Sequence, residues 1–348
     1  MSGKALIART LVILYIFLSA PQVLKASESF FAADGTVRGR ALAMGSASAS
    51  LEDDFSAGLY NPAAFRLNAA RNERAFRLFF NPAGSAAAFH DFSRYDRDFA
   101  VDRKLTETEA LLAASMLLKG MVFTTPAFDF GICLNEDILN ADSIFIESGH
   151  FFSIERNTKG AFHSSFLNLK IAPSISIGIT GTLYDSWKNG RYETGTGYTF
   201  GVLLNPNPKM KIGFVYNEIP NDFSEGRYPL ESIAGGTATG GISYYPDPQT
   251  VISVDVRNLN KETKGAAREI HSGVERVFGE RVALRAGYFR KKSTDYDVYS
   301  AGIGILPAWG RISKYVNSSR SDILTYTFIL EESSSTRQWH MLSLLLRY

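Results

Sequence analysis

Apolar and polar residues alternate with a period of two from about residue 160 to the C-terminus. In the segment 249–257, Ile252 and Val254 occupy one face, and Ser253 and Asp255 occupy the other. This alternation predicts β-strands that each bury or expose one apolar face. The same pattern recurs in the segments 174–184, 281–289 and 323–331. In each of them one face is apolar and the opposite face is small, polar or charged.

The connections between the predicted strands fall into two classes. Short turns are expected at 205–208, 246–248 and 278–280. Longer polar loops are expected at 185–196, 217–232 and 258–269, and one further long connection at 307–322. Short turns on one side and long loops on the other are typical of barrels that span an outer membrane.

The C-terminal segment 339–348 places Leu342, Leu344, Leu346 and Tyr348 on one face. A terminal strand that ends on an aromatic residue is typical of such barrels, in which it closes the sheet. A soluble sandwich or propeller would also alternate, but its polar face would carry more Lys and Glu than the Gly, Ser and Thr found here. The sequence therefore predicts an all-β fold, a transmembrane antiparallel β-barrel of about 14 strands, with 14 to 16 allowed.

The N-terminal residues 1–26 have the pattern of a secretory signal. Lys4 and Arg9 precede the apolar run 11–20, and cleavage is expected after Ala26. A single membrane anchor is the alternative, but a bilayer needs about 20 apolar residues. We therefore expect an exported chain, in which the one cysteine, Cys133, is a small packed residue of a strand.

The residues that follow the signal alternate poorly. We expect 27–72 to form a hatch or plug inside the lumen and 73–348 to form the barrel. Within them a helix is expected at Ser50–Leu59, a first hairpin from 74–81 and 84–92, and another helix at Glu107–Lys119.

The composition of the chain excludes two classes of function. The net charge is +2, which argues against nucleic-acid binding through a basic surface. The mean hydropathy of −0.06 argues against a bundle of membrane helices, whereas a barrel with a polar inside is compatible with it.

Catalytic motifs are missing from the sequence. There is no G-x-S-x-G or H-E-x-x-H, and His163-Ser164 and His271-Ser272 point to opposite faces of their strands. With five scattered histidines and one cysteine, no metal site, no cofactor and no enzyme activity are expected.

Ordered motifs lie at both ends of the chain. The first set is Gly39–Gly45 (GRALAMG), Leu51–Ala57 (LEDDFSA) and Tyr60–Ala63 (YNPA). The second set is SGVE at 272–275, LRAGY at 284–288 and YSAGIG at 299–304. Together they resemble the FadL family of outer-membrane proteins, which includes fatty-acid transporters and the related PorV proteins. The resemblance implies a fourteen-stranded barrel, plugged by an N-terminal hatch, in the outer membrane of a diderm bacterium.

The resemblance also suggests site residues. Asn61, Pro62 and Ala63 would lie in the hatch and take part in gating, together with Gly45. The alternative is that Asn61-Pro62-Ala63 only caps and ends the preceding helix, and the two roles are compatible.

Asp53 and Asp54 are candidates for ion pairs with the inward-facing Arg285 or Arg257, which would hold the plug to the wall. The alternative is a solvated acidic pair at a helix start.

The resemblance implies passive uptake of hydrophobic small molecules, such as long-chain fatty acids, which bind in apolar pockets and pass when the hatch rearranges. The other expected partners are outer-membrane lipid and the barrel-assembly machinery, through the strand that ends at Tyr348. The alternative function is a PorV-like partner or anchor protein of a secretion or surface-attachment system, without a conduit.

Overall fold

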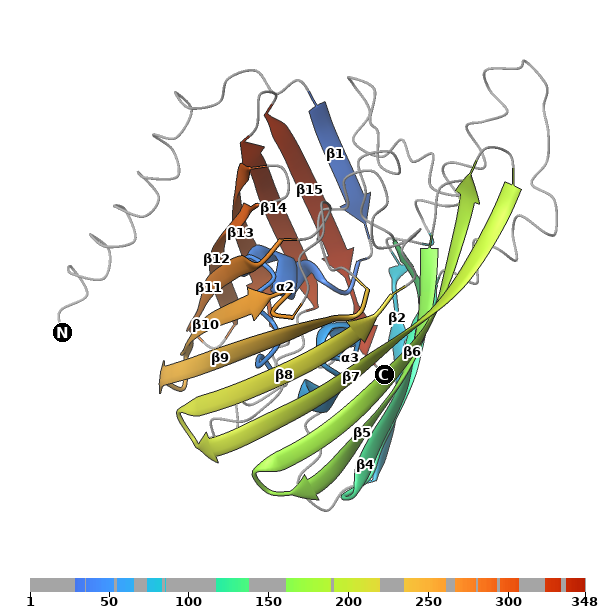
Figure 1. The fold of residues 1–348 in the computed structure, drawn as a ribbon, viewed down its shortest axis with the longest axis vertical. Helices are drawn as coiled ribbons and strands as arrows, with labels where there is room; N and C mark the ends of the chain where they lie inside the picture. Colours follow the sequence, from blue (N-terminus) through green and yellow to red (C-terminus); the bar gives the residue numbers. More distant parts are fainter. Residues whose placement is uncertain are drawn as a thin grey trace.

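β-strands dominate the structure, a computed structural model of the chain (Figure 1). It describes residues 29–34, 36–52, 55–65, 74–82, 85, 117–137, 161–188, 191–219, 235–260, 267–279, 281–292, 295–306, 323–332 and 336–347. The predicted signal at 1–26, the acidic pair Asp53-Asp54, the connection at 307–322 and Tyr348 lie outside these ranges.

The elements follow one another along the chain as a few short N-terminal pieces and then a long series of strands. The N-terminal pieces are β1 (Ser29–Asp34), α2 (Gly39–Ala43), α3 (Phe55–Tyr60) and the 3₁₀ turn η2 (Pro62–Ala64). The strands are β2 (Ala75–Phe80), β3 (Leu118–Thr124), β4 (Phe128–Asp137), β5 (Ala161–Ala172), β6 (Ile175–Lys188), β7 (Arg191–Asn207), β8 (Met210–Glu218), β9 (Thr237–Asp247), β10 (Thr250–Arg257), β11 (Glu269–Phe278), β12 (Val282–Lys291), β13 (Tyr296–Ile305), β14 (Leu324–Glu332), β15 (Arg337–Leu344) and β16 (Leu346–Arg347).

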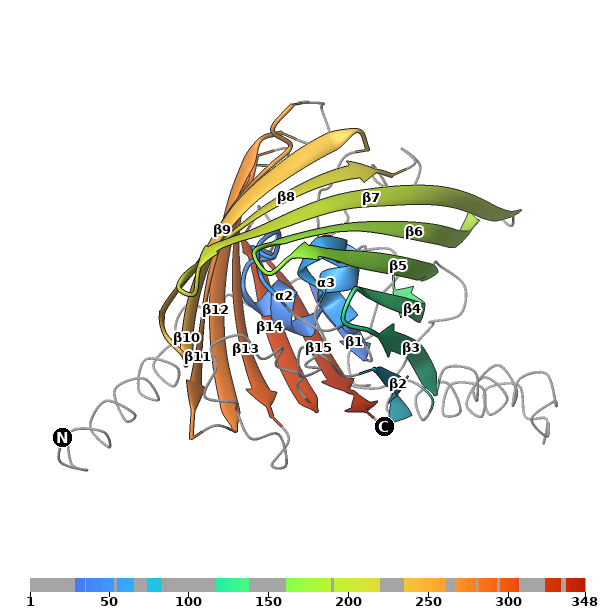
Figure 2. The same cartoon turned by 90° about the horizontal axis from the view of Figure 1, so that it is seen from below.

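The fourteen strands β2 to β15 each pair with the next strand in sequence, and every one of these pairs is antiparallel. The two sides of the barrel meet where the short strand β16, directly after β15, pairs with β2, with Leu346 opposite Phe80 and Arg347 opposite Phe79. Figure 2 shows the strands curving around a common interior. The prediction of an all-β antiparallel barrel of about 14 strands is confirmed.

The two faces of each strand differ as the alternation predicted. In β10, Ile252 and Val254 are 43% and 42% exposed, whereas Ser253 and Asp255 are buried. Large apolar side chains are also exposed on neighbouring strands, among them Ile177, Ile179, Phe200, Phe214, Ile242, Val274 and Ile303. The outer surface of the barrel is therefore apolar and the inner surface largely polar.

The three predicted short turns are confirmed, since β7–β8, β9–β10 and β11–β12 are tight hairpins. The predicted loop at 185–196 is wrong, because β6 and β7 continue through it until Lys188 pairs with Arg191. This segment is polar, which suggested a loop. Its ladder of backbone hydrogen bonds nevertheless continues to the Asn189-Gly190 dipeptide, whose residue types favour tight hairpins.

Three expectations for the N-terminal third need correction. The first hairpin is wrong, since β2 pairs with β3, with Phe76 opposite Phe123. Periodicity does not reveal a strand's partner when a long insert separates the two. The expected helix Glu107–Lys119 gives way to β3 at Leu118, and its residues 107–116 lie outside the described ranges. The helix expected at Ser50–Leu59 begins only at Phe55.

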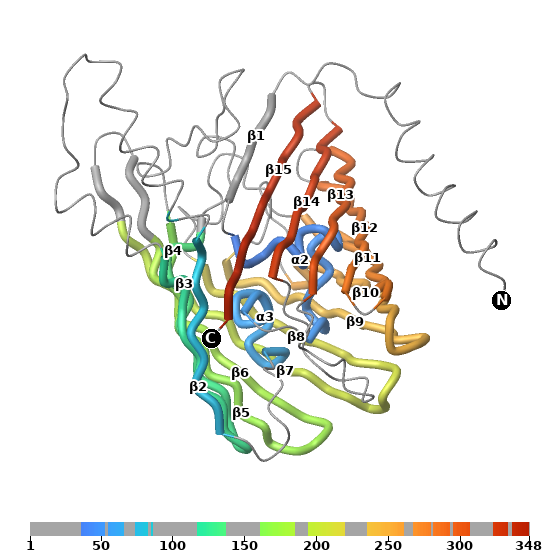
Figure 3. The backbone as a smooth tube through the Cα atoms, turned by 180° about the vertical axis from the view of Figure 1, so that it is seen from behind, coloured from blue at the N-terminus to red at the C-terminus, as the bar shows by residue number. Residues whose placement is uncertain are grey.

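The N-terminal strand β1 joins the sheet rather than the interior. It runs parallel to β15, with Phe31 opposite Trp339, on the edge that β14 leaves open (Figure 1). After β1 the chain enters the space inside the strands, where Figures 2 and 3 show α2 and α3. None of the helices in the described part of the chain is long and apolar enough to cross a membrane.

Candidate functional site in the barrel interior

Residues 36–52 and 55–65, here called the inner segment, lie inside the barrel with nearly all of their side chains buried. α2 packs against β12 to β15, and η2 packs against β5, β6 and β7. Two short helices with only a few helical hydrogen bonds leave many backbone groups that need partners. The wall of the barrel supplies those partners.

The strongest polar contact of the inner segment is centred on Glu275 of β11. Arg40 of α2 donates to both carboxylate oxygens, at 2.8 Å from Nε and 2.9 Å from Nη2. Arg285 of β12 donates to the same carboxylate at 2.7 Å. All three side chains are buried. A two-point arginine–carboxylate contact fixes orientation as well as charge, so α2 is held in one position against β11.

Two further ion pairs join the inner segment to the wall. Glu52 pairs with Lys211 of β8. Arg38 pairs with Glu136 of β4 at 3.0 Å, and Lys119 of β3 approaches the same carboxylate at 2.8 Å. Each of these carboxylates lies within an interior of low polarisability, where an unpaired charge is costly. The buried charges of the inner segment are thus matched one by one by charges of the wall.

Wall side chains also bind the irregular backbone between α2 and α3. The Ala49 amide donates to Asp255 Oδ2 at 2.7 Å, and Arg257 donates to the Ser46 carbonyl at 2.6 Å. His271 also contacts the Gly45 carbonyl at 2.7 Å, and two wall hydroxyls donate to carbonyls of α2 itself, Ser300 to Ala43 (3.0 Å) and Thr327 to Gly39 (2.8 Å). In the non-helical stretch 48–52 the Ala49 amide is thus bonded to the wall and not to a helical carbonyl.

Gly45, a predicted hatch residue, lies where the inner segment approaches the wall closely. Its φ is +63°, and a Cβ there would lie 2.6 Å from the Ser272 carbonyl and 2.8 Å from the Tyr288 amide. Its own amide donates to Ser300 at 3.0 Å. Both the backbone conformation and the lack of space require glycine.

Asn61-Pro62-Ala63 also lies in the inner segment and does two things. The Asn61 side chain accepts a hydrogen bond from the Ala63 amide at 3.0 Å, which caps η2, and Pro62 occupies the first position of that turn. The side-chain amide of Asn61 donates to the Ala49 carbonyl and, at 3.3 Å, to the Val202 carbonyl of β7. The cap therefore belongs to the turn that follows Asn61, and not to the preceding helix α3, which ends at Tyr60. The donor side of Asn61 links both halves of the inner segment to the wall.

The predicted pairing of Asp53 and Asp54 with the wall falls outside the described residues. The structure gives Arg285 a contact with Glu275, and Arg257 a contact with Ser46. Glu52 and Arg40, which carry the observed charge pairs, were missed by the sequence reasoning. Both lie inside the motifs GRALAMG and LEDDFSA, so an inward-facing charge next to a small-residue run was the available signal.

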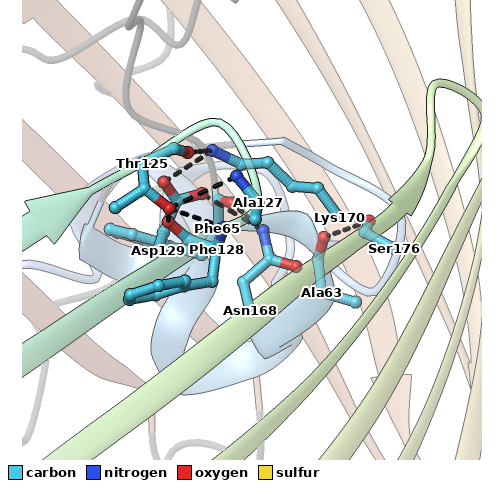
Figure 4. A network of polar contacts seen from close by, with 9 residues as sticks. All are labelled: Ala63, Phe65, Thr125, Ala127, Phe128, Asp129, Asn168, Lys170 and Ser176. Atoms are coloured by element: carbon cyan, nitrogen blue, oxygen red, sulfur yellow. Dashed lines mark hydrogen bonds and ion pairs between the residues drawn. The ribbon is translucent and has the colours of Figure 1, made fainter. Parts of the chain in front are cut away.

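The C-terminal end of the inner segment is held at one rim by a polar network that Figure 4 shows from close by. Asn168 of β5 donates to the Phe65 carbonyl at 2.7 Å, and Ser176 of β6 donates to the Ala63 carbonyl at 2.7 Å. Lys170 pairs with Asp129 at 2.7 Å. Every one of these contacts uses a wall side chain, and most of them are neutral, unlike the ion pairs around α2.

The wall and the inner segment also build an apolar cluster together. The wall contributes Phe79, Val122, Cys133 and Phe166 from β2 to β5, and Leu203 from β7; the inner segment contributes Phe55, Ala57, Ala63, Ala64 and Phe65. All are buried. We call this set the aromatic cluster. A smaller apolar cluster surrounds Leu42 of α2, with Phe289, Val298, Ile329, Trp339 and Met341 of the wall.

Within the part of the chain that the structure describes, no group of three or more His, Cys, Asp or Glu side chains is placed to hold a metal ion. The site is thus a set of charge pairs, backbone contacts and two apolar clusters.

Comparison with known proteins finds similarity in structure alone. No protein-family model matches the chain, and no curated protein matches it in sequence. The structure matches that of the CymD monoaromatic hydrocarbon channel with a TM-score of 0.46 and 10% identity, over 89% of this chain and 95% of that one. It matches the Ralstonia pickettii toluene transporter TbuX with a TM-score of 0.42 and 12% identity, over 89% and 95% of the two chains. A mutant of the Rh. blastica porin matches over 66% of this chain and 75% of that one, at 9% identity and a TM-score of 0.34.

Proposed function

We propose that the chain is a FadL-like conduit in the outer membrane of a diderm bacterium, through which hydrophobic small molecules enter passively. The inner segment is its hatch. The observation that carries this proposal is the aromatic cluster, because it places large apolar side chains on the inside of a barrel whose inner wall also carries many buried polar and charged ones. A hydrophobic solute gains about 0.8 kcal/mol for each methylene group that it buries on such a surface.

The outer surface supports the membrane assignment. Apolar side chains such as Ile177 of β6, Phe214 of β8 and Ile242 of β9 are 39–49% exposed. A continuous apolar surface of this kind would be a liability in water, whereas hydrocarbon chains of lipid cover it at no cost. The chain then needs no long apolar helix in order to be held in a membrane.

The closing strands support assembly by the outer-membrane machinery. β15 carries an inward Trp339 and Met341, and β16 completes the ring against β2. We take this C-terminal strand, which leads to Tyr348, as the segment that the barrel-assembly machinery receives. Long-chain fatty acids are the solutes that the sequence resemblance suggests.

The test is uptake by proteoliposomes that contain the purified full chain. We expect saturable entry of radiolabelled palmitate or toluene, and no faster entry of a polar solute such as glucose than into empty liposomes. A matched sample uses chain that was heat-unfolded before reconstitution. Equal uptake of palmitate, toluene and glucose, or none of any, would contradict the proposal.

One observation favours the alternative, a PorV-like partner or anchor protein. The β6–β7 hairpin continues past the ends of its neighbours, since β5 pairs with β6 only up to Asp185 and β8 pairs with β7 only up to Tyr198. A hairpin that extends beyond the barrel rim offers a surface to another protein. Absence of uptake together with a stoichiometric partner, lost when residues 186–193 are replaced by a short Gly-Ser turn, would favour this second function.

A further inference from the structure

We propose that the aromatic cluster is a binding site for one flat apolar ring, and that Phe55 fills it as an internal substitute for the ligand. The inference rests on the proposed function and specifies its ligand: a compound with one flat apolar ring. Phe55 belongs to the inner segment, whereas Phe79 and Phe166 belong to the wall.

The wall half of the cluster needs an apolar partner. Phe79, Val122, Cys133 and Phe166 all point into the interior from the four neighbouring strands β2 to β5. Without cover, these side chains would face water or the charged side chains of the lumen, which is unfavourable. In the structure Phe55 covers them, and any molecule that displaces it must offer a similar surface.

The geometry around Phe55 is that of an aromatic cage. Its ring centroid lies 4.3 Å from that of Phe79, with the planes inclined by 54°. It lies 6.0 Å from that of Phe166, which it meets edge-on at 89°. Aromatic rings prefer such inclined and edge-on arrangements, because their faces are negative and their edges positive. A flat ring in place of Phe55 would keep both contacts, and an alkyl chain would keep neither electrostatic preference.

Two glycines of the wall, Gly120 and Gly131, lie against the aromatic rings. A Cβ at Gly120 of β3 would collide with the Phe55 ring, and a Cβ at Gly131 of β4 would collide with the Phe166 ring. Two adjacent strands thus give up their side chains where the rings lie. The space beside these two glycines is filled by the rings of Phe55 and Phe166.

Replacement of the Phe55 ring by a ligand ring does not require the contacts that hold the inner segment to the wall to break. The ion pairs of Arg40 and Glu52 lie before Phe55 in sequence, and the contacts of Asn61 and Phe65 lie after it. The Phe55 side chain therefore has to leave the cage while the chain on either side stays bound. Apolar cavities of this kind, made by removing a buried side chain, stay dry and bind benzene.

Equilibrium binding of toluene to the detergent-solubilised full chain tests the cage. We expect one toluene per chain, bound at least tenfold more tightly by Phe55→Ala than by the unchanged protein, because the internal competitor is gone. In the Phe55→Ala background, Phe166→Leu should weaken binding at least tenfold. Phe289→Leu, the same exchange in the cluster around Leu42, should leave it unchanged. Dodecane in equal amount should not displace the toluene.

If Phe55→Ala does not fold, Phe55→Leu removes the ring and keeps most of the bulk, and should still bind toluene more tightly than the unchanged chain. Equal affinity in the Phe55 variants and the unchanged chain, or equal weakening by Phe166→Leu and Phe289→Leu, would overturn the cage. The proposed function fails separately: toluene binding that follows these variants without any uptake by proteoliposomes would keep the cage and remove the conduit. Uptake by proteoliposomes that is the same for every cage variant as for the unchanged chain would keep the conduit and remove the cage.

Discussion

Arg40 of α2 and Glu275 of β11 are joined by two hydrogen bonds of 2.8 and 2.9 Å, both buried inside the barrel. Removal of one partner of a buried ion pair costs about 3–5 kcal/mol, since the other charge is left without compensation. We expect Glu275→Gln to lower the free energy of unfolding by an amount of this order. Arg40→Met should cost less, because Arg285 still pairs with Glu275. The temperature at which the folded band is lost in detergent gels measures both.

The control for this pair lies on the surface. Arg290 and Asp295 pair at 2.8 Å, but their side chains are 52% and 76% exposed. Exposed pairs of this kind contribute about 0–1 kcal/mol. If Arg290→Met destabilised the barrel as much as Glu275→Gln, the buried pair would have no special role in holding the inner segment.

Close packing of the inner segment on β6 gives a second prediction. A Cβ at Gly178 would lie 2.5 Å from the backbone of Pro62, whereas a Cβ at Gly181 of the same strand has no atom nearer than 3.8 Å. We expect Gly178→Ala to destabilise the folded protein by about 1–3 kcal/mol, as overpacked sites do, and Gly181→Ala to have little effect. Unfolding in urea followed by tryptophan fluorescence distinguishes the two. Equal midpoints would mean that η2 moves away from the wall without resistance.

Asn61 allows its two roles to be separated. Asn61→Asp keeps the acceptor that caps η2 but replaces the donor to Ala49 and Val202 with a carboxylate oxygen. Since an unsatisfied buried acceptor costs about 1–3 kcal/mol, we expect Asn61→Asp to be at least as destabilising as Asn61→Ala. Single-channel conductance should rise in both variants as the inner segment loosens. An Asn61→Asp barrel as stable as the unchanged chain would show that capping alone matters.

The outer surface gives a fourth prediction, which concerns depth in the membrane. Ile242 lies in the middle of β9 and is 49% exposed, and Ile270 lies near the beginning of β11 and is 60% exposed. A lysine that faces lipid costs about 2–4 kcal/mol at the midplane and about 0–1 kcal/mol near the interface. Ile242→Lys should therefore reduce the amount of folded protein in outer-membrane fractions, and Ile270→Lys should not. Equal amounts would argue against lipid contact at this face.

The single cysteine provides a direct measure of access to the interior. Cys133 is buried in the aromatic cluster. We expect no reaction with a maleimide in the folded chain and full reaction after boiling in SDS. Phe55→Ala should speed the reaction of the folded chain by removing the ring that covers the cluster, whereas Phe289→Leu should not. Rapid labelling of the unchanged folded chain would show that the inner segment does not close off this region.

The alternation of residue types was enough to predict which side chains face outward. Ile252 and Val254 face out and Ser253 and Asp255 face in, because a strand has a period of two and only one face of a barrel meets lipid. The tight hairpins followed from Pro, Asn, Asp and Gly at their turns. These features depend on residues close together in sequence.

Features that depend on contacts between residues far apart in the sequence could not be predicted from the alternation. The partner of β2 is β3, which follows it only after a long insert. The Ala49 amide is bonded to Asp255 of β10, which lies far away in the sequence. The same applies to Arg40, whose role appears only when Glu275 is beside it. A single sequence gives the face of each inward charge but not its partner, so the motifs were found and the charge pairs within them were not.

The parallel strand β1 sets the order in which the molecule can be completed. Ser29 and the residues after it pair with β15, which begins at Arg337, so the two ends of the chain form one ladder. The edge that β1 occupies does not exist until the last hairpin has been made, although β1 is the first of the strands to be synthesised. Contacts between such distant residues form late. β1 can therefore pair only after the last hairpin has formed, and the inner segment that follows β1 is tied to the sheet at its N-terminal end only then.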